Sequence, residues 1–213
     1  MKKEILITMP TYDEATNYSS YYAGLIAREA ETKGITVVSL KRPRLTQKIF
    51  SEIIQNQNPS FIFFNAHGNE KIIYGDNDEI LIEEGKNHSL LNSKLIFARA
   101  CCAAASLGRA IKGGCFIGYS VNFGFWIDER WSTKPSNDNT ARLFFEPSNL
   151  IVSSLLKGNT AEDAVKKSAE LSKKNILKLM KEQKEPGATA SVVLLWNNMR
   201  GTEICGNKDM KFE

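Results

Sequence analysis

Two uninterrupted apolar runs constrain the fold of this chain more than any other feature. Residues 61–64 (FIFF) and residues 95–98 (LIFA) carry no polar side chain. A strand covered on one face alternates apolar and polar residues, whereas a strand covered on both faces is apolar throughout. The two runs therefore predict buried strands inside a parallel sheet, which needs helices on both of its faces.

The segments before the first run have the alternation expected of such a sheet. Residues 4–9 and 35–40 are of strand length and rich in Ile, Leu and Val. Between them, residues 13–33 place apolar side chains at helical spacing and stop at Gly34, a typical residue after a helix end. A second helix is expected at residues 46–56. Strand, helix, strand, helix, strand with right-handed crossovers builds a parallel sheet between two helical layers.

The remaining segments extend this α/β arrangement. Residues 71–85 contain two apolar pieces around the turn sequence GDND, which predicts a hairpin overhanging the sheet edge. We further expect a short helix at 103–111, strands at 115–121 and 192–196, helices at 140–157 and 160–182, and a hairpin turn within 197–206. The chain, residues 1–213, is then one domain with a mostly parallel sheet of about six strands.

The composition narrows the classes of function. The chain has 213 residues, of which 28 are basic and 24 acidic, for a net charge of +4. This small and dispersed basic excess does not favour nucleic acid as a partner. No apolar run approaches the ~18 residues of a membrane span, and no signal-peptide core precedes Pro10. Four cysteines without framework spacing favour free thiols, so we expect a cytoplasmic protein without a membrane partner.

Chemically capable residues follow both apolar runs. His67-Gly68 comes after the first run and Ala100-Cys101 after the second. Because the carboxyl ends of parallel strands meet at one edge of the sheet, we expect an imidazole and a thiol side by side. These are the base and the nucleophile of acyl transfer. The helix expected at 103–111 would place Cys101 near a helix N-terminus, which lowers the pKa of a thiol.

Acyl transfer also needs two N–H groups that stabilise the developing oxyanion. Gly68 has no side chain, so a substrate carbonyl would reach its backbone directly after His67. The backbone N–H of Cys101 is the second expected donor. The two segments together predict a thiol-based hydrolytic site that requires no metal, and the chain lacks the Cys-x-x-Cys and His-x-x-x-His spacings of zinc ligands.

A family resemblance follows from these residues taken in order. A strand ending in Ala66-His67-Gly68, then a strand ending in Ala100-Cys101 with Leu107-Gly108 after it, resembles the caspase-type cysteine peptidases of clan CD. Within that clan the chain is similar to the CHAT-domain type, since Phe144-Phe145 and residues 155–164 resemble the closing helical pair of those domains. The resemblance spans about residues 60–200.

The resemblance implies a fold and an activity. The fold would be a caspase-like three-layer sandwich, a mostly parallel sheet flanked by helices with a hairpin near the active-site rim. His67 and Cys101 would form the catalytic dyad, with Gly68 in the oxyanion hole and no cofactor. The Ala-Cys junction and the spacing to Leu107-Gly108 favour Cys101 over Cys102 as nucleophile. The expected activity is a cysteine endopeptidase that cleaves protein substrates through a thioacyl intermediate.

Substrate preference stays open at this stage. Related peptidases recognise one side chain, often charged, near the catalytic strands. Asp128 and Glu129 would select Lys or Arg by pairing with it, and Asp76 and Asp78 in the hairpin are alternatives. Each of these acids also suits an ordinary solvated loop.

Two other classes of function remain open alongside the enzyme. The same fold would serve as a non-catalytic interaction module, with His67 an ordinary hydrogen-bonded residue at a strand end. It would also serve as a flavodoxin-like small-ligand-binding domain. Cys102, Cys115 and Cys205 are expected to be buried and inert. For the enzyme, the expected partners are a protein or peptide substrate and a regulatory protein.

Overall fold

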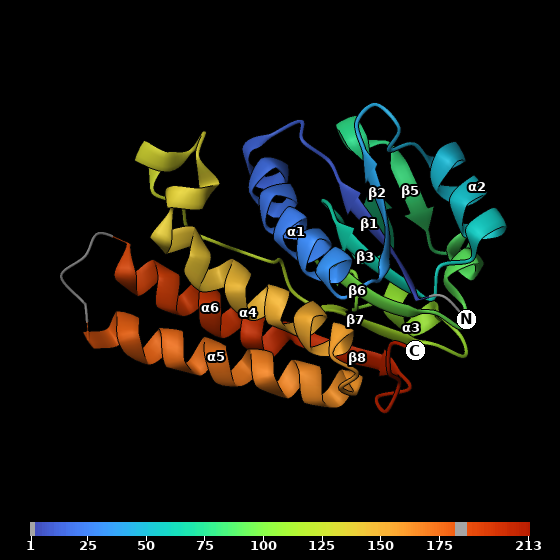
Figure 1. The fold of residues 1–213 in the computed structure, drawn as a ribbon. Coiled ribbons are helices and arrows are strands. Elements are labelled where there is room, and N and C mark those ends of the chain that lie inside the picture. Colours follow the sequence, from blue (N-terminus) through green and yellow to red (C-terminus); the bar gives the residue numbers. More distant parts are fainter. Residues whose placement is uncertain (1–2, 182–186) are drawn as a thin grey trace.

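A central sheet of six strands organises the protein. The computed structural model describes residues 3–181 and 187–213. The sheet has the order β2-β1-β3-β6-β7-β8 (Figure 1). Its strands are β1 (Glu4–Met9), β2 (Thr36–Lys41), β3 (Phe61–Asn65), β6 (Leu95–Arg99), β7 (Cys115–Tyr119) and β8 (Thr202–Gly206). All neighbouring strands pair in parallel except β8, which runs antiparallel to β7. The predicted mostly parallel sheet is confirmed.

Helices and a hairpin cover the two faces of this sheet. The helices are α1 (Glu14–Thr32), α2 (Gln47–Gln57), α3 (Leu107–Ala110), α4 (Asn139–Leu156), α5 (Ala161–Lys181) and α6 (Ala188–Gly201). The hairpin consists of β4 (Ile72–Tyr74) and β5 (Ile80–Glu83). Short 3-10 turns are η1 (Asp76–Asp78), η2 (His88–Leu91), η3 (Glu129–Trp131) and η4 (Pro135–Asn137). This three-layer arrangement fits the expected caspase-like sandwich, and the helix expected to end at residue 182 is described as far as Lys181.

The apolar runs are explained by burial on both faces of the sheet. Phe61 and Phe63 of β3 lie in the core cluster formed with α1 and α4. Ile62 and Phe64 lie in the opposite cluster, formed with α2, α3 and the β4–β5 hairpin. Every residue of β3 is therefore buried. Within the described residues, no helix combines the length and apolarity needed to cross a membrane.

The strand expected at residues 192–196 is wrong, because this segment belongs to α6. The buried residues of α6 recur every three or four positions: Ala188, Ser191, Leu195, Asn198 and Gly201. Val193 and Trp196 are 53% and 51% exposed, respectively. Leu195 packs with Phe144 of α4 and with α5. Burial on one helical face thus stabilises a helix, and the last strand of the sheet is β8 instead, paired with β7.

The helix expected at residues 103–111 is also wrong in extent. Residues 101–106 form turns, and α3 has only four residues. The backbone N–H of Cys102 donates to Val121 O at 2.9 Å, and that of Ala104 donates to Tyr119 O at 3.0 Å. These long-range bonds hold the segment alongside the end of β7. Cys102 also has a left-handed backbone with φ of 55°, which a right-handed helix through this residue excludes.

Candidate active site

The ends of β3 and β6 bring the two predicted segments together. The strands pair in register, with Asn65 opposite Arg99, and the Ala66 N–H donates to Arg99 O at 3.2 Å. His67 and Cys101 each follow two residues later. A Cβ placed on Gly68 would lie 3.0 Å from Ala100 Cβ and 3.3 Å from Cys101 O. The backbone of Gly68 is therefore in direct contact with the segment that carries Cys101.

His67 has an acidic partner that the sequence interpretation missed. Its Nε2 lies 2.6 Å from Oδ2 of Asp13, and the two side chains are 39% and 40% exposed. Because an ionised carboxylate only accepts hydrogen bonds, Nε2 carries the hydrogen of this bond, and the neutral imidazole then has its lone pair on Nδ1. The ring of Tyr12 meets the imidazole edge to face, 5.9 Å between centroids. The histidine is thus held by two consecutive residues of one loop.

Asp13 is available because it caps α1 with only one of its oxygens. Oδ1 accepts the Thr16 N–H at 2.7 Å and the Thr16 hydroxyl at 2.6 Å, which leaves Oδ2 for His67. Partial burial acts to raise the pKa of Asp13, but hydrogen bonds from Thr16 and His67 outweigh it and lower the pKa below its ordinary value. Asp-x-x-Thr signals a helix start, yet nothing local indicates a partner 54 residues away.

The β4–β5 hairpin fixes the backbone on the other side of His67. The Tyr74 N–H donates to His67 O at 3.0 Å, and Gly68 forms a bridge with Ile73. The hairpin turn also reaches the loop before α1, where the Tyr12 hydroxyl donates to Asp78 Oδ1 at 2.7 Å. The predicted hairpin therefore lies at the sheet edge beside His67 and helps to position the residues that hold the imidazole.

The Cys101 thiol lies in a different environment from the one expected. Burial raises its pKa, and a hydrogen bond from the Phe123 N–H offsets this only in part, so the net shift is upward. No helix starts at Cys101, so the predicted lowering of its pKa by a helix terminus is wrong. Within the described residues, no hydrogen bond joins this thiol to His67. The thiol is therefore neutral at pH 7 in the substrate-free protein.

Cys102 is neither buried nor apolar in its contacts. Its backbone adopts a left-handed conformation with φ of 55°, and its Sγ lies 3.3 Å from Asn122 Oδ1. Cys205 is likewise half-buried, with Sγ 3.6 Å from Ala104 O. The expectation of burial is thus wrong for these two thiols and confirmed for Cys115.

Two backbone donors remain unused beside the thiol. Among residues 3–181 and 187–213, neither the Gly68 N–H nor the Cys101 N–H has a hydrogen-bond acceptor. Both residues are half-buried and belong to contacting segments. Their N–H groups are the two groups that an oxyanion hole at this edge would use.

Arg99 holds the end of β6 in place, two residues before Cys101. Its side chain is buried, with the guanidinium 5.1 Å from the ring centroids of both Phe63 and Phe145. It donates hydrogen bonds to Ser148 and Asn149 of α4. Burial lowers the pKa of Arg99 to about 10, which still leaves it charged at neutral pH. The strand end that carries Cys101 is therefore fixed against α4 by a buried cation.

The acids considered for substrate selection lie in two separate places, the loop before α4 and the turn of the β4–β5 hairpin. Asp128 pairs with Arg130 of its own loop at 2.6 Å, and Glu129 is exposed in the adjoining 3-10 turn. This loop packs against α1, away from the strands in Figure 1. In the hairpin, Asp76 pairs with Arg42 at 3.2 Å, and Asp78 accepts the Tyr12 hydroxyl. Selection of Lys or Arg by Asp128 or Glu129 stays a prediction.

The described part of the chain holds no group of three His, Cys, Asp or Glu side chains that would bind a metal ion. The groups that this edge offers are an imidazole held by a carboxylate, a neighbouring thiol and two N–H donors without an acceptor among the described residues. Comparison with known protein families and with curated proteins finds no match to the chain.

Proposed function

We propose that this protein is a caspase-like cysteine endopeptidase of the CHAT type. One observation carries the proposal: the in-register ends of β3 and β6 bring His67-Gly68 into contact with Ala100-Cys101, where two backbone N–H groups are free. A thiol, a base and an oxyanion hole are the three parts of covalent peptide hydrolysis. The substrates are proteins or peptides, and a regulatory protein partner and a cytoplasmic location belong to the same proposal.

The first half of the reaction acylates the thiol. Cys101 Sγ attacks the carbonyl carbon of the peptide bond while its proton passes to Nδ1 of His67. The oxyanion that forms accepts hydrogen bonds from the Gly68 and Cys101 N–H groups. The carbon–nitrogen bond then breaks, and the imidazolium returns its proton to the leaving amine. Asp13 acts as a positioning residue that fixes the tautomer and stabilises the imidazolium.

The second half releases the product and restores the thiol. Water attacks the thioester carbonyl, and His67 removes a proton from that water. The oxyanion forms again in the same place, and the carbon–sulfur bond breaks when His67 returns the proton to Sγ. No metal or organic cofactor takes part, because the nucleophile, the base and the donors all come from the chain.

A peptide acyloxymethyl ketone that carries a fluorophore tests this proposal. Such a probe alkylates a thiol only where a peptide site presents the thiol and its base to it. We expect labelling at Cys101, located by peptide mass spectrometry, and loss of labelling in His67→Ala. The matched control is His88→Ala, because the Nδ1 of His88 accepts the Gly85 N–H in an exposed turn. Slow and uniform labelling of all four cysteines would contradict the proposal.

A non-catalytic interaction module is the second candidate. The raised pKa of Cys101 and the lack of a hydrogen bond from its thiol to His67 favour this alternative. Catalytic hydrogen bonds often form only when substrate is bound, so the two candidates predict different effects of a bound peptide. If a non-cleavable peptide aldehyde fails to protect Cys101 from iodoacetamide, the module is the better assignment.

A further inference from the structure

A basic groove lies beside the proposed active site, along the exposed side of α1. Its volume is about 730 Å³, which is large enough for a small ligand or several residues of a peptide. Asn17, Gly24 and Arg28 of α1 form its floor. Lys41 and Arg42, at the end of β2, form one wall, and Ser132, Thr133 and Pro135 form the other.

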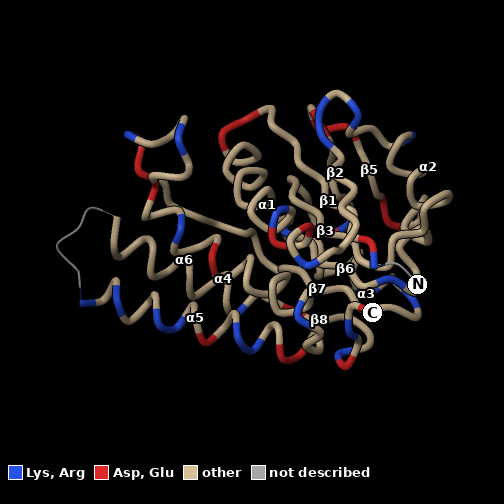
Figure 2. Tube along the Cα trace, viewed as in Figure 1, with Lys and Arg blue, Asp and Glu red and all other residues tan. Residues whose placement is uncertain are grey.

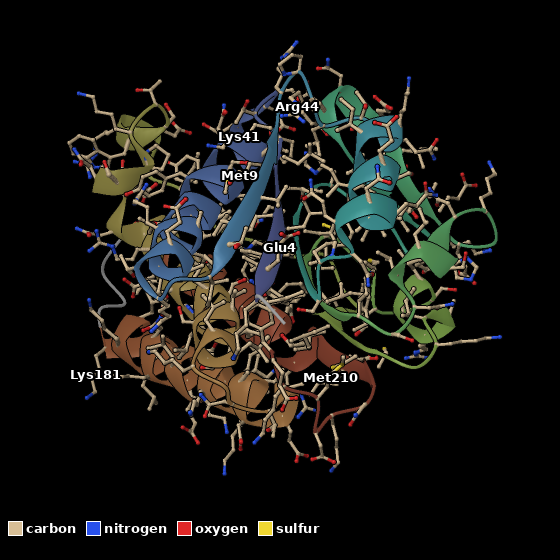
Figure 3. The ribbon with its side chains drawn as sticks, turned by 45° about the vertical axis from the view of Figure 1, so that its right-hand side comes forward. Glu4, Met9, Lys41, Arg44, Lys181 and Met210 are labelled. Atoms are coloured by element: carbon tan, nitrogen blue, oxygen red, sulfur yellow. The ribbon has the colours of Figure 1, made fainter. Side chains whose placement is uncertain are left out.

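The groove is positively charged. Among the residues that the structure describes, its lining includes three cations, Arg28, Lys41 and Arg42, and no carboxylate. Arg28 and Lys41 have no ion pair within the described residues. Arg42 pairs with Asp76, but the arginine side chain is still 53% exposed. Figure 2 shows the chain after β2 in blue, and Figure 3 places Met9, Lys41 and Arg44 at the same end of the sheet. The groove therefore presents uncompensated cations to solvent.

The shape of the groove favours an extended acidic peptide over a single phosphate. Asn17 and Arg28 are 11 residues apart on α1, which corresponds to about 16 Å along the helix axis. A peptide of roughly five extended residues has this length. Lys41 and Arg42 come from the end of β2 and Arg28 comes from α1, so two separate elements supply the cations. The N–H groups that begin α1 are also occupied by the Asp13 carboxylate, which would repel an anion there. In the described part of the chain, Tyr21 is the one aromatic residue that lines the groove, and a stacking surface for nucleic acid needs more.

The groove and the proposed active site share one loop. Thr11 lines the groove, Tyr12 contacts the His67 ring and Asp13 binds its Nε2. In the sheet, β6 and β2 are separated by three strand-to-strand distances. Together these are about 14 Å, the length of roughly four extended residues. We infer that the groove binds an acidic segment of the polypeptide substrate, roughly four residues from the cleaved bond. This inference rests on the proposed function, because it places the segment relative to Cys101.

Binding of a fluorescein-labelled hexaglutamate peptide to full-length Cys101→Ala protein tests the inference without hydrolysis. We expect binding by fluorescence anisotropy that weakens with salt and is absent for hexaglutamine. The double variant Arg28→Glu/Lys41→Glu should weaken it by at least about tenfold, because charge-assisted bonds are lost and like charges replace them. Lys166→Glu/Lys167→Glu on α5 makes the same change in net charge at two exposed positions and should alter binding less than about twofold. All four positions are exposed, so the fold should survive.

Each other outcome overturns a defined part of the inference. Equal loss in both double variants would show attraction to net charge alone. Binding of inorganic pyrophosphate without binding of hexaglutamate would show a small-anion site. If hexaglutamate binds in the groove but the ketone probe never labels Cys101 of the wild-type protein, the peptidase proposal and the substrate assignment fail together, and only an acidic-peptide site remains. If the probe labels Cys101 but hexaglutamate does not bind, the peptidase proposal stands and the groove assignment fails.

Discussion

The ends of β3 and β6 are similar in backbone and different in electrostatics. Both strands are buried along their whole length, and each is followed two residues later by a side chain able to take part in acyl transfer. The imidazole at the end of β3 has a charged partner from a distant loop, 2.6 Å away and accessible to solvent. The thiol at the end of β6 is held by a backbone N–H and has a raised pKa.

This difference indicates which group is prepared for chemistry before substrate arrives. The histidine already has a fixed tautomer and orientation, because Asp13 is ionised and anchored by the helix cap. The cysteine has no comparable support, since the expected helix N-terminus is absent. Activation of the thiol would therefore depend on His67 and on bound substrate, and the variants below test that division of roles.

Removing either proposed catalytic side chain should have the largest effect. Cys101→Ala should abolish hydrolysis of a fluorogenic peptide, and His67→Ala should reduce kcat/KM by at least about 10³-fold, as expected when a unit of nucleophile and base is broken. The measurement is initial rate against substrate concentration, with His88→Ala as the control. Nearly full activity in His67→Ala would mean that the thiol is activated by another group, and the comparison would fail.

Gly68→Ala should have the next largest effect, because it crowds the contact between the two strand ends. The added Cβ would lie 3.0 Å from both Ala100 Cβ and Ile72 O. We expect a loss in kcat of about 10²-fold from displacement of the Gly68 N–H. Overpacking should also lower the free energy of unfolding by about 1–3 kcal/mol. Urea denaturation measures stability separately, and an unchanged kcat in a folded Gly68→Ala protein would remove this N–H from the oxyanion hole.

Asp13→Asn should reduce kcat/KM by about tenfold to a hundredfold, less than loss of the base itself. Asparagine is also a good helix cap, so α1 should keep its start. The charge-neutralising control is Asp163→Asn in the first turn of α5. A kcat/KM equal to that of wild type over the whole pH range would show that the carboxylate does not position the base.

The same variant has a defined dependence of stability on pH. The pKa of Asp13 is lower in the folded protein than its ordinary value of 3.8. The ionised carboxylate therefore stabilises the fold above pH 3.8, and this contribution is lost as the pH falls through the lower folded-state pKa. Wild type should exceed Asp13→Asn in free energy of unfolding at neutral pH, and the difference should shrink in acid. A difference that grows in acid would contradict the direction of the shift.

Tyr12→Phe should have the smallest effect. It removes the hydroxyl that bonds Asp78 and keeps the ring that contacts His67. The free energy of unfolding should fall by about 0.5–1.5 kcal/mol, the usual net value of one hydrogen bond. Tyr74→Phe is the control, because its hydroxyl makes only a longer bond to Asn69 at 3.3 Å. Amide hydrogen exchange in β4 and β5 would show whether the hairpin, rather than the whole fold, is loosened.

Much of the scaffold could be predicted from the sequence, because burial leaves a local pattern. The runs at residues 61–64 and 95–98 indicate buried strands, and they indicate that their ends share an edge. The run at 192–196 misleads because a short apolar segment fits a strand or a buried helix equally well. The segment after Cys101 misleads because alanine favours helices, yet hydrogen bonds to the end of β7 decide its path.

The partners of the candidate site could not be predicted in the same way. Asp13 has a clear local role as a helix cap, and its second role depends on a residue 54 positions away. The free N–H of Gly68 likewise follows from the spacing of the bridge to Ile73, which no local pattern specifies. Such contacts are set by how the elements dock against each other, which only the assembled fold reveals.

The tripeptide Thr11-Tyr12-Asp13 contacts the groove, the hairpin and the imidazole in three consecutive residues. A ligand in the groove that shifts this segment would change the affinity for a ligand at Cys101. By thermodynamic linkage, a ligand at Cys101 would then change the affinity in the groove by the same factor. Three residues of one connecting loop would thus be enough for cooperativity inside a small protein, without any movement of its sheet.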